Sequence, residues 1–246
     1  MKLFAILLLT VSLMGWSAQT AGANSLPYYW LPWTYGGSRK VEQGNNEYPS
    51  HKGNCTYAWD FSATVNNWLV RAARGGVVSA VKDNSSIGGC SRDYDGYENY
   101  VKIDTGDGYE TLYAHLQYAS VGGKITEGEV ITAYEPIGNT DNTGYSCGDH
   151  LHYQVQTPCS GSFCTSVSSS FLDPDVLRQN PDGIPRTPQS VISGNHAKGT
   201  DGIGFYKGNG EWHLRNALTG NGGSNYITVF GGHSGDIPVT GDWDGH

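Results

Sequence analysis

The sequence predicts an all-β or β-dominated fold built on an antiparallel sheet, and three observations support this prediction. The chain holds 35 Gly and 16 Tyr among its 246 residues, but only 2 Met. Abundant glycine and aromatic residues are typical of short strands joined by frequent turns. Several segments alternate apolar and polar residues with the period of two that indicates a strand. Asp107-Gly108 stands between two such segments, as in a β-hairpin.

Strands are expected where this alternation is clearest. In chain order these segments are residues 54–62, 75–81, 100–104, 109–115 and 150–156. In the first of them Ala58, Asp60 and Ser62 would share one face, because alternate residues of a strand point to the same side. The aromatic-rich segment 24–50 is interpreted as packing over a sheet edge rather than as one wall of a substrate groove.

Residues 1–23 have the pattern of a signal peptide. Lys2 supplies a positive charge, residues 4–14 are apolar but too few to span a bilayer, and residues 21–23 offer small side chains for cleavage. No later segment is long and apolar enough for a membrane helix. We therefore expect an exported, soluble protein, located outside the cell or in the periplasm.

The charge balance excludes two classes of partner. The formal net charge is −8 at pH 7, and no long run of Lys or Arg occurs. Such a chain is not suited to bind nucleic acid or an anionic membrane. We expect no nucleic-acid partner, no membrane insertion and a monomeric protein.

Five cysteines are present, and export permits disulfides. Cys159 and Cys164 are close enough in sequence to close a small loop. Cys55 with Cys90 is a plausible second pair, which would leave Cys147 unpaired. The pairing stays open at this stage, because spacing alone does not decide it.

The stretch from residue 142 to residue 156 has His150-Leu151-His152 at its centre. Apolar Leu151, Tyr153 and Val155 alternate with polar residues, which predicts a half-buried strand. The two histidines would then stand on one face, about 6.5–7 Å apart by the rise of a strand. Taken alone, such a motif is better explained by two solvated histidines on an edge strand.

Three further residues give the histidine pair a chemical context. His51, Asp60 and His115 each lie beside a turn or on an expected strand. Two imidazoles and a carboxylate form a three-ligand zinc site with a fourth position open for water, which is typical of catalytic zinc. Two further imidazoles would be available for proton transfer or for stabilising an oxyanion. The absence of a His-Glu-x-x-His motif argues against a helix-borne zinc protease.

Four short motifs follow one another along the chain. They are His51-Lys-Gly, Asp60-Phe, Tyr113-Ala-His115-Leu and Gly148-Asp-His150-Leu-His152-Tyr. Together they resemble the signature of the lysostaphin-type zinc endopeptidases of peptidoglycan, colinearly over residues 35–157. The resemblance implies zinc ligands at His51, Asp60 and His152 and catalytic histidines at His115 and His150. It also implies one zinc ion and hydrolysis of a peptide bond of the bacterial cell wall by a metal-activated water.

The chain departs from the family's usual spacing, in which the aspartate follows the first histidine by four residues. Cys55 stands at that place here, and Asp60 lies nine residues after His51. An insertion at residues 54–57 that bulges out before the strand would leave Asp60 in the ligand position. A zinc-bound Cys55 thiolate and a degenerate, metal-free site are the alternatives. We favour Asp60, because it has the strand context and Cys55 is expected in a disulfide.

Two other functions fit parts of the chain. Residues 144–148 match Gly-x-Ser-x-Gly around Ser146, and Asp173 or Asp175 and then His196 follow in the order of a serine hydrolase. That motif requires strand–turn–helix, whereas here the turn leads into a strand, so Ser146 is interpreted as a loop residue. A non-catalytic cell-wall binding module, or an activator of another wall hydrolase, would use the same fold without needing the ligand set.

The predicted organisation places a peptidase domain at residues 24–175, a Pro-rich linker at 176–195 and a further unit at 196–246. The last unit resembles part of a β-propeller repeat of the FG-GAP type. Residues 241–245 are similar to the opening of a calcium loop, although a solvated turn is the favoured interpretation. Tyr48 is a further candidate oxyanion donor, for which a surface or packing role is favoured.

Overall fold

The computed structural model describes residues 28–63, 67–122 and 125–195, together with the backbone of strands at residues 203–206, 211–215 and 226–229. The predicted signal peptide and calcium-loop opening lie outside the described residues. Within the described part of the chain, no helix is both long enough and apolar enough to cross a membrane.

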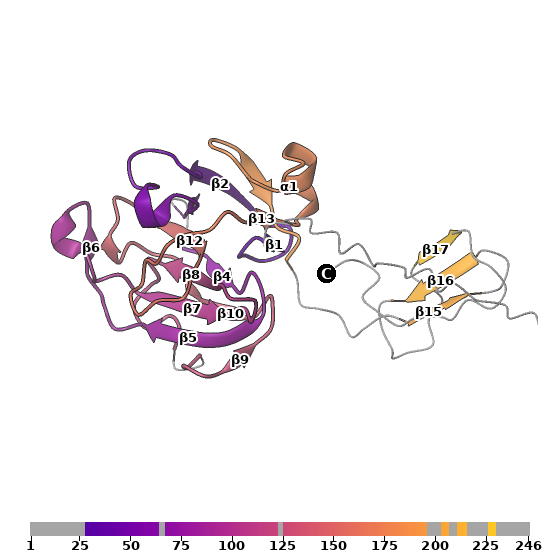
Figure 1. The fold of residues 1–246 in the computed structure, drawn as a ribbon, viewed down its shortest axis with the longest axis horizontal. Helices are drawn as coiled ribbons and strands as arrows, with labels where there is room; N and C mark the ends of the chain where they lie inside the picture. The colour runs from indigo at the N-terminus through magenta and orange to yellow at the C-terminus, as the bar shows by residue number, and fades with distance from the viewer. Residues whose placement is uncertain are drawn as a thin grey trace, which may run out of the picture.

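The main element is an eight-stranded sheet in which every pair of neighbours is antiparallel (Figure 1). In spatial order its strands are β14 (Ser190–Ile192), β2 (Ser38–Gln43), β3 (Trp59–Ser62), β12 (His150–Gln156), β8 (Glu110–Ala114), β7 (Tyr100–Asp104), β5 (Gly76–Lys82) and β9 (Val130–Ile131). The predicted fold class is therefore confirmed. β12 lies in the middle of the sheet, between β3 and β8.

Short elements complete the described fold. β1 (Tyr28–Tyr29) pairs with β13 (Ser170–Phe171), β4 (Leu69–Arg71) with β10 (Pro136–Asn139), and β6 (Gly88–Gly89) with β11 (Gly144–Tyr145). Single 3-10 turns occur at Gly53–Cys55 and Arg92–Tyr94, and the α-helix is α1 (Pro174–Gln179). β15 (Ile203–Tyr206), β16 (Glu211–Arg215) and β17 (Tyr226–Val229) form an antiparallel sheet of their own. The likeness of that unit to a propeller repeat stays a prediction.

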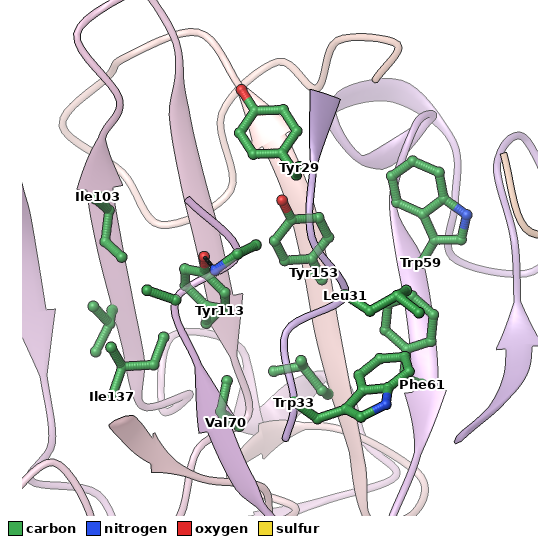
Figure 2. Close-up of a cluster of buried hydrophobic side chains, with 14 of the residues drawn as sticks. Tyr29, Leu31, Trp33, Trp59, Phe61, Val70, Ile103, Tyr113, Ile137 and Tyr153 are labelled. Carbon is green, nitrogen blue, oxygen red and sulfur yellow. Dashed lines mark hydrogen bonds between the residues drawn. The ribbon is translucent and has the colours of Figure 1, made fainter. Parts of the chain in front are cut away.

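The hydrophobic core lies on one face of the main sheet. Tyr113 and Tyr153 project from neighbouring strands and are packed with Phe61 and Trp33, as Figure 2 shows. Trp33 meets Phe61 edge to face, with ring centroids 4.9 Å apart, an arrangement that aromatic pairs prefer. The aromatic N-terminal segment therefore packs over the sheet, as expected, although it covers the face of the sheet rather than an edge.

β12 has the predicted bounds, but it is not half-buried. Six of its seven residues are buried, including Gln154 and Gln156 on the face that alternation marks as polar. Residues 157–166 cover this face, and the amide groups of both glutamines are hydrogen-bonded to that loop. Buried amides are tolerated when each finds a partner, so polarity alone did not indicate exposure.

The expected strand at residues 54–62 begins later than predicted. Gly53–Cys55 form a 3-10 turn, Gly53 has a left-handed φ of 57°, and the Ala58 N–H donates to the Cys55 carbonyl at 3.0 Å. These local hydrogen bonds replace strand pairing until Trp59, where β3 starts. The extra residues after His51 therefore bulge out ahead of the strand.

The segment predicted as a Pro-rich linker is packed onto the sheet. α1 packs beside β14, and β14 pairs with β2 at the end of the main sheet (Figure 1). The buried carboxylate of Asp173 ties this segment to the N-terminal part of the domain, because it accepts hydrogen bonds from the N–H groups of Leu31 and Gly194. The domain boundaries themselves remain a prediction.

The disulfides correct one expectation and confirm another. Cys159 is bonded to Cys164, as predicted. Cys90 is bonded to Cys147 rather than to Cys55, which is a free thiol. The parallel pairing of β6 with β11 brings Cys90 next to Cys147, a proximity that spacing in the sequence does not reveal.

Candidate metal centre and active site

Three predicted ligands meet at one end of β12. His51 precedes the 3-10 turn, Asp60 lies on β3, and His152 lies directly opposite Asp60 in the β3–β12 register. One ligand atom from each residue lies within 4.8 Å of the others, and all three side chains are buried. The bulge after His51 is what allows Asp60 to reach this group from the strand.

One oxygen of Asp60 is surrounded by imidazole nitrogens. Oδ1 lies 3.1 Å from His51 Nε2, 3.0 Å from His152 Nδ1 and 3.6 Å from His150 Nε2. Burial by itself would raise the pKa of Asp60, but the charge of His150 and the hydrogen bond from His152 hold that pKa well below its usual range. Asp60 is therefore ionised over the whole neutral range.

The donor set fits a divalent cation. The Gly44 carbonyl can only accept, so His51 Nδ1–H donates to it at 2.7 Å and leaves Nε2 as a lone pair. That Nε2 is buried without a hydrogen-bond partner and faces the Asp60 oxygen. Two facing lone pairs repel each other unless a cation lies between them. Nitrogen and carboxylate ligands in this arrangement suit zinc.

His115 and His150 lie beside the ligand group, with ring centroids 4.8 Å apart. His115 Nδ1–H donates to the Thr143 carbonyl at 2.7 Å, and His150 Nδ1–H donates to the Gly148 carbonyl at 2.8 Å. Each ring thus keeps Nε2 as its basic nitrogen. His115 also has a left-handed φ of 64°, a strained conformation that is common at functional sites.

The pKa values of two histidines are displaced in opposite directions. Burial lowers the pKa of His115 to about 3, helped by the neighbouring charges of His150 and His152, so His115 is neutral at neutral pH. Burial also lowers the pKa of His152, but its hydrogen bonds to Asp60 and Cys55 outweigh this effect and raise the pKa to about 10. In the metal-free protein His152 therefore carries a proton that a metal would displace.

Asp60, His115, His150 and His152 line a cleft of about 840 Å³. Phe163 forms part of its wall, with its ring centroid 5.1 Å from that of His152. Glu42, Asp95 and Glu98 also line the cleft. Tyr48 lines it as well and is 85% exposed, so the surface interpretation agrees with the structure, and an oxyanion role stays a prediction.

Cys55 lines the same cleft as a half-buried free thiol. The group of ligand atoms nevertheless consists of His51, Asp60 and His152. The expected disulfide, which had argued against a Cys55 ligand, is wrong, yet the register of β3 against β12 still brings Asp60 to the two histidines.

Ser146 does not lie in a nucleophile elbow. β11 leads through a turn into strand β12, not into a helix. Ser146 Oγ is buried, donates to the Gly148 carbonyl at 2.8 Å and lies 3.2 Å from His150 Nδ1. Asp173 is bound to backbone N–H groups elsewhere in the fold, and His196 lies outside the described residues. The loop interpretation of Ser146 agrees with this geometry.

Sequence reasoning missed several neighbours of the site. Gln154 Oε1 lies 3.1 Å from His152 Nε2, and the Phe163 ring lies beside the rings of His115 and His152. Gln154 carried a usable signal, because it follows His150 and His152 on the same face of β12 at the same spacing of two. Phe163 carried none, because only folding of the loop brings it to the site.

Residues 54–163 match the family model described as Peptidase family M23. The matched segment contains Asp60, His115, His150 and His152 and begins just after His51. It spans somewhat less than half of the chain, and it supports placing this part of the chain with that family. Among curated proteins, the DD-carboxypeptidase/endopeptidase Mpg of Neisseria meningitidis is 44% identical over 84 residues, which are 34% of this chain. The chain covers only 18% of the length of that relative.

Two solved catalytic domains are also similar to this chain. The catalytic domain of the prophage-encoded M23 protein EnpA from Enterococcus faecalis is 18% identical and has a TM-score of 0.40, covering 56% of this chain and 94% of its own. The catalytic domain of the antimicrobial peptidase lysostaphin from Staphylococcus simulans is 20% identical and has a TM-score of 0.35, with coverage of 55% and 88%.

Proposed function

We propose that this chain is a zinc-dependent endopeptidase of Peptidase family M23 that hydrolyses peptide bonds of bacterial peptidoglycan outside the cytoplasm. The observation that carries the proposal is the buried group of His51, Asp60 and His152 with two further imidazoles beside it in an open cleft. The match of residues 54–163 to the family supports it, as does the similarity to the DD-carboxypeptidase/endopeptidase of Neisseria. Export is supported by the pattern of residues 1–23 and by two disulfides.

In this proposal His51, Asp60 and His152 hold one zinc ion. When bound, zinc supplies a Lewis acid that polarises a peptide carbonyl and lowers the pKa of a water molecule toward about 7. The Gly44 carbonyl orients the His51 ring so that Nε2 would be the nitrogen free to bind the ion, and Asp60 would offset one of its two positive charges.

His115 and His150 would handle the proton. Their Nδ1 atoms are tied to the Thr143 and Gly148 carbonyls, so the Nε2 atoms are the ones that can accept and return it. Burial lowers the pKa of His115 to about 3, so the ring is neutral at neutral pH and its Nε2 would be available as a proton acceptor. A histidine that has taken up the proton can then deliver it to the leaving amine or stabilise the oxyanion.

Zinc content and cleavage, measured on the same preparations, test the proposal. The parent protein should contain about one zinc per chain, and His152→Ala should contain much less. His150→Ala is the matched control, because this ring lies beside the ligand group. It should keep the zinc and lose about 100-fold or more of the cleavage rate, measured by mass spectrometry of peptidoglycan fragments.

The two parts of the proposal fail in different ways. A parent protein that takes up no zinc would refute the hydrolase assignment. Retention on insoluble peptidoglycan, without any cleavage product, would then favour a wall-binding module or an activator of another wall hydrolase. Zinc uptake with cleavage only of other proteins would retain the metallopeptidase and refute the peptidoglycan substrate.

A further inference from the structure

A buried row of amides continues from the metal group along β12. His152 Nε2 lies 3.1 Å from Gln154 Oε1, and Gln154 Nε2 lies 3.0 Å from the Cys164 carbonyl and also contacts Gln156 Oε1. Gln154 and Gln156 are both fully buried. Such a row is unusual on a strand face and requires every amide to be satisfied.

The backbone of the covering loop decides which way each amide points. The Cys164 carbonyl can only accept, so it requires the NH₂ group of Gln154, and the oxygen of Gln154 must then face His152. Gln156 is held in the same way, because its oxygen accepts from the Cys164 N–H at 3.0 Å and its NH₂ donates to the Ser162 carbonyl at 3.0 Å.

An ion pair anchors the far end of the row. Lys102 Nζ donates to Glu110 Oε1 at 2.8 Å and to the carbonyls of Cys159 and Gly161 at 2.7 and 3.1 Å. Gln156 Nε2 donates to the same Glu110 oxygen at 2.7 Å. The loop that supplies these carbonyls is closed by the Cys159–Cys164 disulfide. The two amides are thus held by the loop along their length, and Gln156 is held at the far end by Glu110.

The fixed orientation of Gln154 determines which nitrogen of the His152 ring carries hydrogen. Because the oxygen of Gln154 can only accept, His152 Nε2 must carry hydrogen and donate to it. Nδ1 is then the nitrogen left for a metal, and it is the one that lies 3.0 Å from Asp60 Oδ1. A partner that orients a metal-binding imidazole in this way also raises its basicity.

We propose that Gln154 is a positioning residue that fixes the His152 ring with Nε2–H toward the amide row and Nδ1 toward the metal. The proposal rests on the proposed function, since it concerns the ring that is assigned there as a zinc ligand. Gln154 touches neither substrate nor metal in this account. It acts through His152, and the loop closed by Cys159 and Cys164 acts through Gln154.

The test compares zinc affinities, by competition with a chromophoric chelator, of the parent and of Gln154→Met. Methionine has a similar length but cannot accept from His152, so the zinc dissociation constant should rise about 10- to 100-fold. Gln154→Glu keeps an acceptor toward His152 and should retain more of the affinity than Gln154→Met. Thr111→Val is the matched control, because Thr111 is equally buried on neighbouring β8 but belongs to the opposite face of the sheet.

A second readout needs neither metal nor activity. In the metal-free parent labelled with nitrogen-15 histidine, the Nε2–H of His152 should give a resonance that exchanges slowly with water, and Gln154→Met should lose it. Free exchange of that proton in the parent, or unchanged zinc affinity in Gln154→Met, would overturn the positioning role. If the parent binds no zinc, the proposed function fails, and the resonance alone still decides whether Gln154 holds the ring.

Discussion

The buried ion pair beneath the loop gives the sharpest prediction of stability. The side chains of Lys102 and Glu110 are 4% and 2% exposed, and Nζ lies 2.8 Å from Oε1. We expect Glu110→Gln to destabilise the protein, because it keeps the shape of the side chain but leaves the Lys102 ammonium buried without its counter-charge.

The expected loss of unfolding free energy depends on the hydrogen-bond acceptors that Lys102 retains in Glu110→Gln. Removing one partner of a buried pair costs about 3–5 kcal/mol. Lys102 retains two backbone carbonyls, those of Cys159 and Gly161, as acceptors. We therefore expect the lower end, about 3 kcal/mol, which for a domain of this size lowers the melting temperature by roughly 6–12 °C.

Urea unfolding with the disulfides intact, followed by tryptophan fluorescence, measures this loss. The midpoint should fall while the slope stays unchanged, because the native surface is unaltered. The double variant Lys102→Met with Glu110→Gln should lose less free energy of unfolding than the two single variants lose together, because no unpaired charge remains. Glu98→Gln is the matched control. Glu98 is also buried but accepts from the Ser162 hydroxyl, which an amide oxygen can still do.

The control defines the result that refutes the reasoning. If Glu110→Gln lowers the free energy of unfolding no more than Glu98→Gln does, the Lys102–Glu110 pair does not hold its charges away from water. If the double variant equals the sum of the single ones, Lys102 and Glu110 do not interact energetically. Either result would also remove the anchor proposed for the amide row.

Three further outcomes are expected. The zinc affinity should rise about tenfold per pH unit from pH 7 to 9, because below its pKa of about 10 His152 must release a proton to bind the metal, and a flat profile in chelator competition would contradict this. Gly88→Ala should cost about 1–3 kcal/mol in urea unfolding, because its Cβ would lie 1.9 Å from the Asn142 carbonyl oxygen. Gly148→Ala, whose Cβ meets no atom within 4 Å, should stay within about 0.5 kcal/mol, and equal costs would refute the steric argument. Cys55→Ser should keep its zinc, because Asp60 completes the ligand group. A thiol-alkylating reagent should inhibit cleavage by the parent, because Cys55 lines the cleft, but should not inhibit cleavage by Cys55→Ser. Loss of zinc in Cys55→Ser would instead favour a thiolate ligand.

Several features of the fold were predictable because they are local. β7 and β12 have the bounds that alternation predicted, and the Asp107-Gly108 turn joins β7 to β8. The Cys159–Cys164 loop was also predictable, because its two cysteines are close in sequence. In each case the residues that decide the structure are neighbours along the chain.

Other features depended on partners that are distant in sequence. The burial of Gln154 and Gln156 follows from a covering loop, and the Cys90–Cys147 bond follows from the pairing of β6 with β11. Residues 176–195 read as a linker because of their prolines, yet Asp173 and β14 tie this part of the chain to the sheet. No local pattern encodes these contacts, because they arise only when remote segments meet.

Residue types and their spacing were enough to define the chemical repertoire: a β-rich chain, a pair of histidines on one strand face, and a small set of further histidines and carboxylates able to bind a metal. These are properties of side-chain type and spacing. The choice of the carboxylate that joins His51 and His152 depended on the folded chain. It is made where the bulge at Gly53–Cys55 and the register of β3 against β12 bring Asp60 to the two histidines. The tertiary structure also decided which nitrogen of each ring faces the site, because that depends on acceptors such as the Gly44 carbonyl and Gln154, which folding alone brings into contact.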